Sequence, residues 1–270
     1  MPDSPDQTTI HTPLISTHTH TDLSRCGRDD MTFAAIVDQA EALGYAVIIL
    51  TDHVHVPWYT DYPAHLERLA QYRTWRNGLR TPLQLFVGAE FEVRRPGHVL
   101  APPEFVAASE VTVVAPNHYQ LDWVEPLPRD PGAAAAHELD CIETIINWAP
   151  ADVIVHPFTG GGAEMPANVL YAAADTGRLR ELCDRAIQAD IAVEIQPKYW
   201  RNPLADRLCG FFEQWLDAGG KVALGSDAHH LAALSRWAAE LPDIVARFEL
   251  TAADIWWPGA AASQQQRERA

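Results

Sequence analysis

Short apolar runs recur along the chain, and each ends at, or a few residues before, a side chain that can bind a divalent metal ion. Runs of this length are typical of buried strands. The runs, with the residues that follow them, are 14–17 (His18 and His20), 45–51 (Asp52 and His53), 83–89 (Glu90), 111–115 (His118), 152–155 (His156), 191–193 (Glu194) and 222–226 (Asp227 and His229). Ligands confined to the carboxyl ends of parallel strands are typical of a βα barrel, whose loops converge on one pocket.

Helical periodicity separates these runs. Apolar residues at 33, 36, 37, 40 and 43 form one stripe, which Gly44 is suited to end. Alternating strands and helices predict parallel strands joined by helical crossovers. The proline-rich stretch 126–131 predicts a surface loop. Further helices are predicted at 64–77, 133–148, 178–189, 204–218 and 231–241.

A doubly wound open sheet is the competing architecture. Its nucleotide-binding signature, a glycine-rich turn after the first strand, is absent from the sequence. The glycine run at 160–162 is not followed by Lys-Ser/Thr and is therefore no P-loop. We interpret it as a flexible edge of the pocket.

The chain of 270 residues suits one barrel domain at 14–260, with flexible ends at 1–13 and 261–270. No apolar run approaches the ~18 residues typical of a membrane span. The first residues lack the basic and apolar regions of a secretory signal. These features predict a cytoplasmic protein without a membrane partner.

The net charge of −16 disfavours nucleic acid as the main partner, because binding a phosphate backbone normally needs a basic stripe. Bound divalent cations would offset part of this charge and attract an anionic substrate. Simple solubility is the alternative explanation, and charge alone does not separate the two.

Individual side chains suit a multinuclear metal site. In His18-Thr19-His20, strand alternation places both imidazoles on one side of the chain. Asp52-His53 offers either a ligand alone or a ligand together with the residue that orients it. A carboxylate such as Glu90 can bridge two ions through its two oxygens.

Six motifs, in order, resemble the polymerase and histidinol phosphatase (PHP) family. They are H-T-H-T-D-L-S-R-C-G (18–27), T-D-H (51–53), G-A-E (88–90), N-H-Y (117–119), H-P-F (156–158) and G-S-D-A-H (225–229). The resemblance covers most of the chain. It implies a distorted seven-stranded TIM-like (βα)7 barrel, two or three divalent ions, and hydrolysis of a phosphoester by a metal-bound hydroxide.

The resemblance also implies which residues hold each ion. For the first ion they are His18, His20, Glu90 and Asp227; for the second, Glu90 with His118 and His156; for the third, His53 and His229 with Cys26. Many relatives have His where this chain has Cys26. A thiolate there would favour zinc or another borderline ion such as iron over magnesium, with manganese a further candidate. Alternatively, Cys26 only packs and the third site is weak.

Two cations on the first and sixth loops, Arg25 and Lys198, are candidates to clamp the phosphate, although either could be a solvated surface charge. The proton donor to the leaving group is either Asp52 or a metal-bound water. The expected substrate is a small-molecule phosphate ester.

Three classes of function remain. The favoured class is a small-molecule phosphatase. A second is a metal-dependent hydrolase of a non-phosphate bond, which a pocket edge without cations would support. The third is a non-catalytic regulatory domain, which the nearly complete ligand set disfavours.

Overall fold

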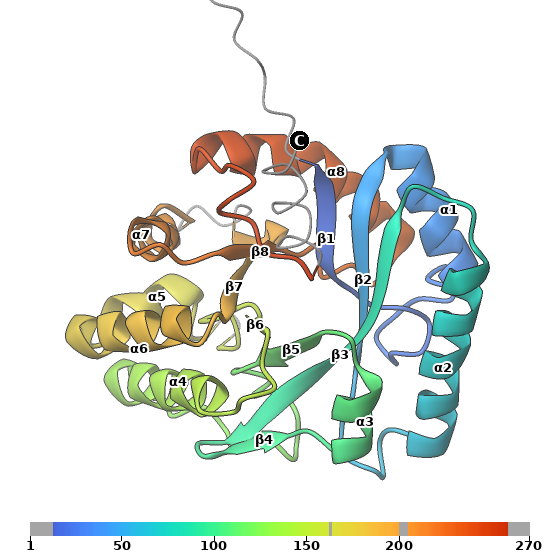
Figure 1. Ribbon diagram of the computed structural model, residues 1–270. Coiled ribbons are helices and arrows are strands. Elements are labelled where there is room, and N and C mark those ends of the chain that lie inside the picture. Colours follow the sequence, from blue (N-terminus) through green and yellow to red (C-terminus); the bar gives the residue numbers. More distant parts are fainter. Residues whose placement is uncertain (1–12, 162–163, 200–204, 259–270) are drawn as a thin grey trace, which may run out of the picture.

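Seven parallel strands follow one another around a nearly closed barrel in a computed structural model that describes residues 13–161, 164–199 and 205–258 (Figure 1). Their order is β1-β2-β3-β5-β6-β7-β8, which is also their order along the chain. A doubly wound sheet would reverse that order at a switch point. The observed order therefore excludes the open sheet and confirms the TIM-like α/β barrel.

The strands differ greatly in length. Their bounds are β1 Leu14–Thr19, β2 Tyr45–His53, β3 Gln84–Arg95, β4 His98–Leu100, β5 Thr112–Ala115, β6 Val153–Ile154, β7 Ala192–Ile195 and β8 Val222–Leu224. The hairpin strand β4 was not predicted. It pairs antiparallel with an extension of β3, across a turn in which Gly97 adopts a φ of 80°.

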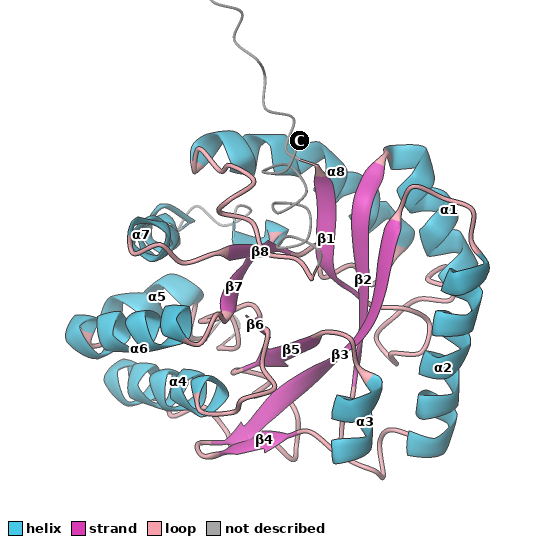
Figure 2. Cartoon of the chain, in the orientation of Figure 1, coloured by secondary structure: helices cyan, strands magenta, loops and turns pink. Residues whose placement is uncertain are grey.

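Helices cover the outside of the sheet (Figure 2). Their bounds are α1 Phe33–Leu43, α2 Tyr62–Gly78, α3 Pro103–Ala108, α4 Pro131–Ile146, α5 Ala167–Ala173, α6 Thr176–Gln188, the 3₁₀ turn η1 Pro197–Tyr199, α7 Ala205–Asp217 and α8 Leu231–Arg247. The expected first helix is confirmed: Thr32 caps its start, and Gly44 ends it with a φ of 78°. The short helices α3 and α5 were not predicted.

The predicted proline-rich loop ends one residue early. Pro131 is the first residue of α4, where its missing N–H is not needed, and the Asp130 side chain accepts a hydrogen bond from Ala133 N at 2.9 Å.

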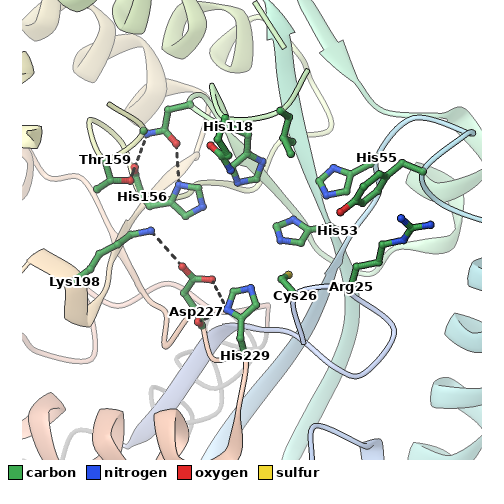
Figure 3. A pocket seen from close by; sticks show the side chains of 15 residues that line it. Arg25, Cys26, His53, His55, His118, His156, Thr159, Lys198, Asp227 and His229 are labelled. Atoms are coloured by element: carbon green, nitrogen blue, oxygen red, sulfur yellow. Dashed lines mark hydrogen bonds and ion pairs between the residues drawn. The ribbon is translucent and has the colours of Figure 1, made fainter. Parts of the chain in front are cut away.

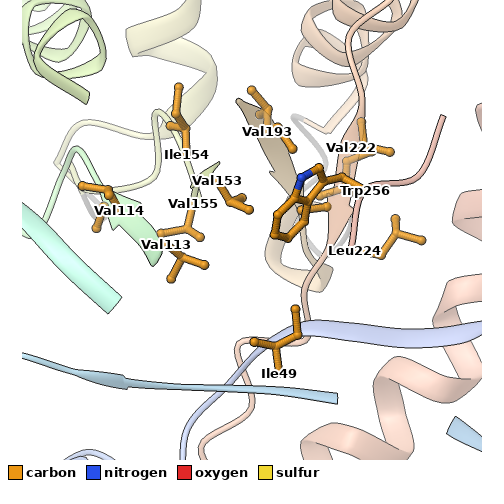
Figure 4. Close-up of a cluster of buried hydrophobic side chains, with 14 of the residues drawn as sticks. Ile49, Val113, Val114, Val153, Ile154, Val155, Val193, Val222, Leu224 and Trp256 are labelled. Atoms are coloured by element: carbon orange, nitrogen blue, oxygen red, sulfur yellow. The ribbon is translucent and has the colours of Figure 1, made fainter. Parts of the chain in front are cut away.

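Branched aliphatic side chains of the strands form a buried apolar cluster (Figure 4). Ile49, Val113, Val153, Val193 and Val222 come from five different strands, and none is more than 2% exposed. Full burial of such a side chain contributes roughly 1.5–3 kcal/mol. This apolar packing holds the strands that carry the polar groups at their other ends.

The barrel closes between β1 and the loop after β8. There Asp227 N donates to His18 O at 2.9 Å, and His20 N donates to Ala228 O at 3.0 Å. This closing seam thus coincides with residues predicted to bind metal.

Residues 1–12, 162–163, 200–204 and 259–270 are not described. The predicted flexible ends therefore lie outside the described residues, apart from Pro13, as does Gly162 of the glycine run. Among the described helices, none is both long and apolar enough to cross a membrane.

Candidate metal centre

The strand ends converge on a pocket of about 470 Å³ (Figure 3). The predicted site residues that line it are Arg25, Cys26, His53, His118, His156, Lys198, Asp227 and His229. Three more, His18, His20 and Glu90, are buried, at most 1% exposed, and contact residues of the lining. Eleven of the twelve predicted side chains therefore gather in one place.

Glu90 lies at the centre of this group. It stands in β3, two residues before the part of the strand that pairs with β4. It is 1% exposed, and five imidazoles surround its carboxylate. From Glu90 Oε2 the distances are 2.7 Å to His53 Nδ1, 3.3 Å to His18 Nε2 and 3.5 Å to His20 Nε2; from Oε1 they are 3.0 Å to His156 Nε2 and 3.4 Å to His118 Nε2. These imidazoles come from four different strands or the loops that follow them.

Three groups of three side chains place their ligand atoms within 4.8 Å of one another. The groups are His18, His20 and Glu90; His53, Glu90 and His118; and His20, His53 and His229. Glu90 belongs to two of them and can therefore bridge two ions. Asp227 Oδ1 extends the first group, at 3.3 Å from His20 Nε2.

Two buried atoms at this centre have no hydrogen-bond partner among the described residues: Glu90 Oε2 and His53 Nδ1. They lie 2.7 Å apart, but not in a hydrogen-bonding geometry. Unpaired buried polar atoms are costly, and a divalent cation between imidazole and carboxylate ligands would satisfy both. The residues therefore fit divalent metal ions.

The second ring nitrogen of the other predicted histidines faces an oxygen atom. The distances are 2.8 Å from His18 Nδ1 to Glu194 Oε1, 3.3 Å from His20 Nδ1 to Ser24 Oγ, 3.2 Å from His118 Nδ1 to Glu92 Oε2, 3.1 Å from His156 Nδ1 to Asn117 Oδ1, and 2.9 Å from His229 Nδ1 to Asp227 O. Metal-binding histidines are oriented in this way, because the oxygen fixes both the tautomer and the ring.

Asp52 does not line the pocket and is 1% exposed. Its oxygens accept hydrogen bonds from Thr21 N, Thr21 Oγ1 and Ser24 Oγ, each at 2.7 Å. Ser24 in turn contacts His20. Of the two alternatives for Asp52-His53, the geometry favours Asp52 as the residue that orients the ligands, and it gives Asp52 no path to a leaving group.

Glu92 was missed by the sequence reasoning. It follows Glu90 by two residues, so strand alternation puts both carboxylates on one face of β3, and that spacing could have revealed it. Glu92 Oε2 lies 3.1 Å from His55 Nδ1, and Glu92 Oε1 accepts from Trp123 Nε1 at 2.5 Å. Burial raises the pKa of Glu92, but hydrogen bonds with His118 and His55 outweigh it and lower the pKa to about 2.

Glu138, on α4, was also missed and carries no signal in the sequence. It is 0% exposed and accepts hydrogen bonds from Asn117 Nδ2 at 3.1 Å, Phe158 N at 2.6 Å and Tyr119 Oη at 2.5 Å. Burial raises its pKa. Through Asn117, Glu138 supports the orientation of His156.

Carboxylates and imidazoles at the centre carry opposite charges. Burial opposes ionisation of Glu90, but the imidazoles of His53, His18 and His118 lower its pKa well below the usual value. Burial likewise lowers the pKa of His18, yet the carboxylates of Glu194 and Glu90 raise it well above its ordinary value. The carboxylates and imidazoles therefore stabilise each other's charged forms.

Cys26 is exposed at the pocket wall and belongs to none of the three groups within the described chain. Desolvation, followed by the charge of Glu90, raises the pKa of its thiol to about 12. In the third group, His20 joins His53 and His229, so the imidazoles there come together without the sulfur.

Lys198 and Arg25 lie on opposite walls of the pocket (Figure 3). Lys198, on η1, places Nζ 3.3 Å from Asp227 Oδ2. The Arg25 guanidinium carbon lies 4.2 Å from the centroid of the Tyr59 ring.

Two of the predicted ligands have strained backbone. His156 and Asp227 follow short strands and adopt φ values of 36° and 48°. Non-glycine residues in this region cost on the order of 1–3 kcal/mol and cluster at functional sites. Nearby, a Cβ on Gly225 would lie 1.9 Å from Glu194 Oε1, so only glycine leaves room for that carboxylate.

Solved structures share this architecture. Histidinol phosphate phosphatase from Lactococcus lactis subsp. lactis Il1403, crystallised with zinc, L-histidinol and phosphate, matches with a TM-score of 0.61 and 14% identity over 88% of this chain and 94% of that chain. A candidate histidinol phosphatase from Listeria monocytogenes matches with a TM-score of 0.54 and 12% identity over 82% of this chain and 97% of that chain. The resemblance to PHP phosphatases is thereby confirmed at the level of the fold. No protein-family model and no curated protein matches the sequence.

Proposed function

We propose that this protein is a metal-dependent phosphoesterase that hydrolyses a small-molecule phosphate ester. One observation carries the proposal: five imidazoles surround the buried Glu90 carboxylate, whose Oε2 has no hydrogen-bond partner among the described residues, beside a 470 Å³ pocket. A pocket of this size holds a metabolite rather than a polymer.

Two or three divalent ions would be held by the three groups of ligands. The first comprises His18, His20, Glu90 and Asp227; the second comprises Glu90, His118 and His156, with His53 close to the same carboxylate; the third comprises His53 and His229, with His20 adjacent and Cys26 as a further candidate ligand. Bound there, such ions would acidify water and neutralise phosphate oxygens. The imidazole and carboxylate set suits zinc, iron or manganese.

The chain's own residues supply position and charge. Glu194, Glu92 and Asn117 hold the ligand imidazoles with one nitrogen facing the centre. We assign Lys198 Nζ, which lies 3.3 Å from Asp227 Oδ2, to a non-bridging phosphate oxygen. Because Asp52 is saturated by its own hydrogen bonds, we assign it to positioning and assign it no proton transfer.

The likeness to a phosphatase crystallised with L-histidinol and phosphate supports a small phosphate ester, and the net charge of −16 disfavours nucleic acid. The cations Lys198 and Arg25 at the pocket edge also favour a phosphate ester over a neutral substrate, which would offer them no negative charge.

A screen of phosphate release tests the proposal. The purified protein is incubated with a panel of phosphate monoesters, with zinc or manganese added and with a chelator. We expect turnover that requires metal. If elemental analysis finds bound metal but no ester is hydrolysed, a hydrolase of another bond or a metal-binding regulatory domain replaces the proposal.

A further inference from the structure

The two cations of the pocket differ in their partners. Lys198 Nζ is already paired with Asp227. Arg25, exposed on the opposite wall, has no carboxylate within 4.0 Å among the described side chains. Arg25 therefore has its charge available for a ligand, and it stands away from the cation that serves the reacting phosphate.

Arg25 is held in place by an aromatic wall. Its guanidinium stacks over Tyr59, whose ring lies 5.2 Å from His55 and 4.9 Å from Trp123 between centroids. Trp123 is anchored by its hydrogen bond to Glu92. A stacked guanidinium keeps its donors free at the edge, where they match the two oxygens of a carboxylate or phosphate.

The same pocket offers nothing to a cationic substrate group. Among its described lining residues, Asp227 is the one acid, and it faces Lys198, His18 and His20. An ammonium group on the substrate would thus be desolvated without an opposite charge. The charge of the pocket lining therefore disfavours substrates that carry a cationic group.

We propose that Arg25, supported by Tyr59, binds a second anionic group on the alcohol part of the substrate. This inference rests on the proposed function and narrows it: the preferred substrates are phosphate esters that carry a carboxylate or another phosphate. Arg25 is then a specificity residue, rather than the clamp on the reacting phosphate that the sequence suggested.

Matched pairs of esters test this preference. 3-Phosphoglycerate is compared with glycerol 3-phosphate, and fructose 1,6-bisphosphate with fructose 6-phosphate; within each pair, only one compound has the second anion. Phosphoethanolamine supplies a cationic leaving group. We expect kcat/KM to favour the doubly anionic member of at least one pair by about tenfold or more, mainly through KM, because a remote contact acts on binding. The two pairs distinguish a carboxylate from a second phosphate.

Variants assign the preference to Arg25. Arg25→Gln removes the charge at similar size, and we expect it to abolish the preference by lowering kcat/KM for the doubly anionic ester about ten- to a hundredfold more than for its partner. Arg28→Gln, in the same loop but outside the pocket lining, removes an equal charge. It should change kcat/KM by the same factor for both esters of a pair. Tyr59→Phe should retain the preference, while Tyr59→Leu should weaken it.

Equal losses for both members of each pair in Arg25→Gln would overturn the inference and return Arg25 to the reacting phosphate. A wild-type preference for the singly anionic esters or for phosphoethanolamine would also overturn it. If the metal-loaded protein hydrolyses no ester, the proposed function itself fails and this inference fails with it, an outcome distinct from hydrolysis without the charge preference.

Discussion

The two halves of the barrel bring their ligands to the centre by different means. In the half formed by β1, β2 and β3, strands of 6, 9 and 12 residues run to the ligands themselves. β2 and β3 pair without interruption up to His53 opposite Glu90. The other half, β5 to β8, consists of strands of 4, 2, 4 and 3 residues.

In the short-strand half, the ligands stand beyond the last paired residues. His156 and Asp227 adopt left-handed backbone conformations. Side chains from other strands and loops hold His156 in place. Asn117 contacts the His156 ring, and Glu194 Oε2 accepts from His156 N at 2.9 Å. The strand ladder thus places His53 and Glu90 in the first half, whereas the second half relies on buried hydrogen bonds of side chains to hold His156.

The largest effect is expected at Glu90, where imidazoles from both halves meet. Glu90→Gln removes the bridging charge, and because metal-ion catalysis contributes several kcal/mol, we expect kcat/KM to fall by at least about a thousandfold. Phosphate release and bound metal per protein are the measurements. Glu41→Gln, exposed on α1, is the matched control. Retention of metal and activity would remove Glu90 from the centre.

Glu194→Gln tests the short-strand half. Glu194 faces His18 Nδ1, His156 N and Gln196 Nε2, and the one carbonyl oxygen of glutamine cannot serve them all. We expect metal affinity to fall about ten- to a hundredfold, measured by competition with a fluorescent chelator. Glu181→Gln, exposed on α6, should bind as the wild type does.

Gly225→Ala tests the same half through packing alone. The added Cβ would lie 1.9 Å from Glu194 Oε1 and 3.0 Å from His18 Cβ, so the carboxylate must move. Overpacking of this kind costs about 1–3 kcal/mol, and we expect Tm to fall by roughly 2–10 °C, with weaker metal binding. Gly78→Ala, which meets no atom within 4 Å, is the control. An unchanged melting curve would show that Glu194 is not confined.

The smallest effect is expected in the long-strand half. Ser24→Ala removes the oxygen 3.3 Å from His20 Nδ1, but the hydrogen bond from His20 N to Ala228 O still holds the backbone of His20. We therefore expect metal affinity to fall less than about tenfold, below the loss in Glu194→Gln. Ser109→Ala, on a distant hydrogen bond to Phe105 O, serves as control. Equal losses at Ser24 and Glu194 would erase the difference between the halves.

The sequence predicted the long-strand half well, since local signals determine it. Apolar runs ending at His18, His53 and Glu90 mark the strands β1, β2 and β3, and the pairing of β2 with β3 places His53 opposite Glu90. The helix between β1 and β2 was predicted with its observed bounds, because Gly44 supplies the left-handed cap. The apolar runs and the glycine cap are both local features of the sequence.

The remainder depends on contacts between distant residues. Glu138 reaches Asn117 across 21 positions, and Glu194 reaches His18 across 176, so neither pairing has a local pattern. The hydrogen bonds from Thr21 and Ser24 to Asp52 likewise span 31 and 28 positions. The position of Arg25 likewise depends on the fold, which brings Tyr59 beneath it.

The backbone hydrogen bonds from Asp227 N to His18 O and from His20 N to Ala228 O fasten the last strand to the first. Any cation bound by His18, His20 and Asp227 would therefore also link the first strand to the loop after the last strand. Metal binding and closure of the barrel would then be coupled, and removal of the ions would let this seam open first. Amide hydrogen exchange at His20 and Asp227 would report that loosening before the apolar interior gave way.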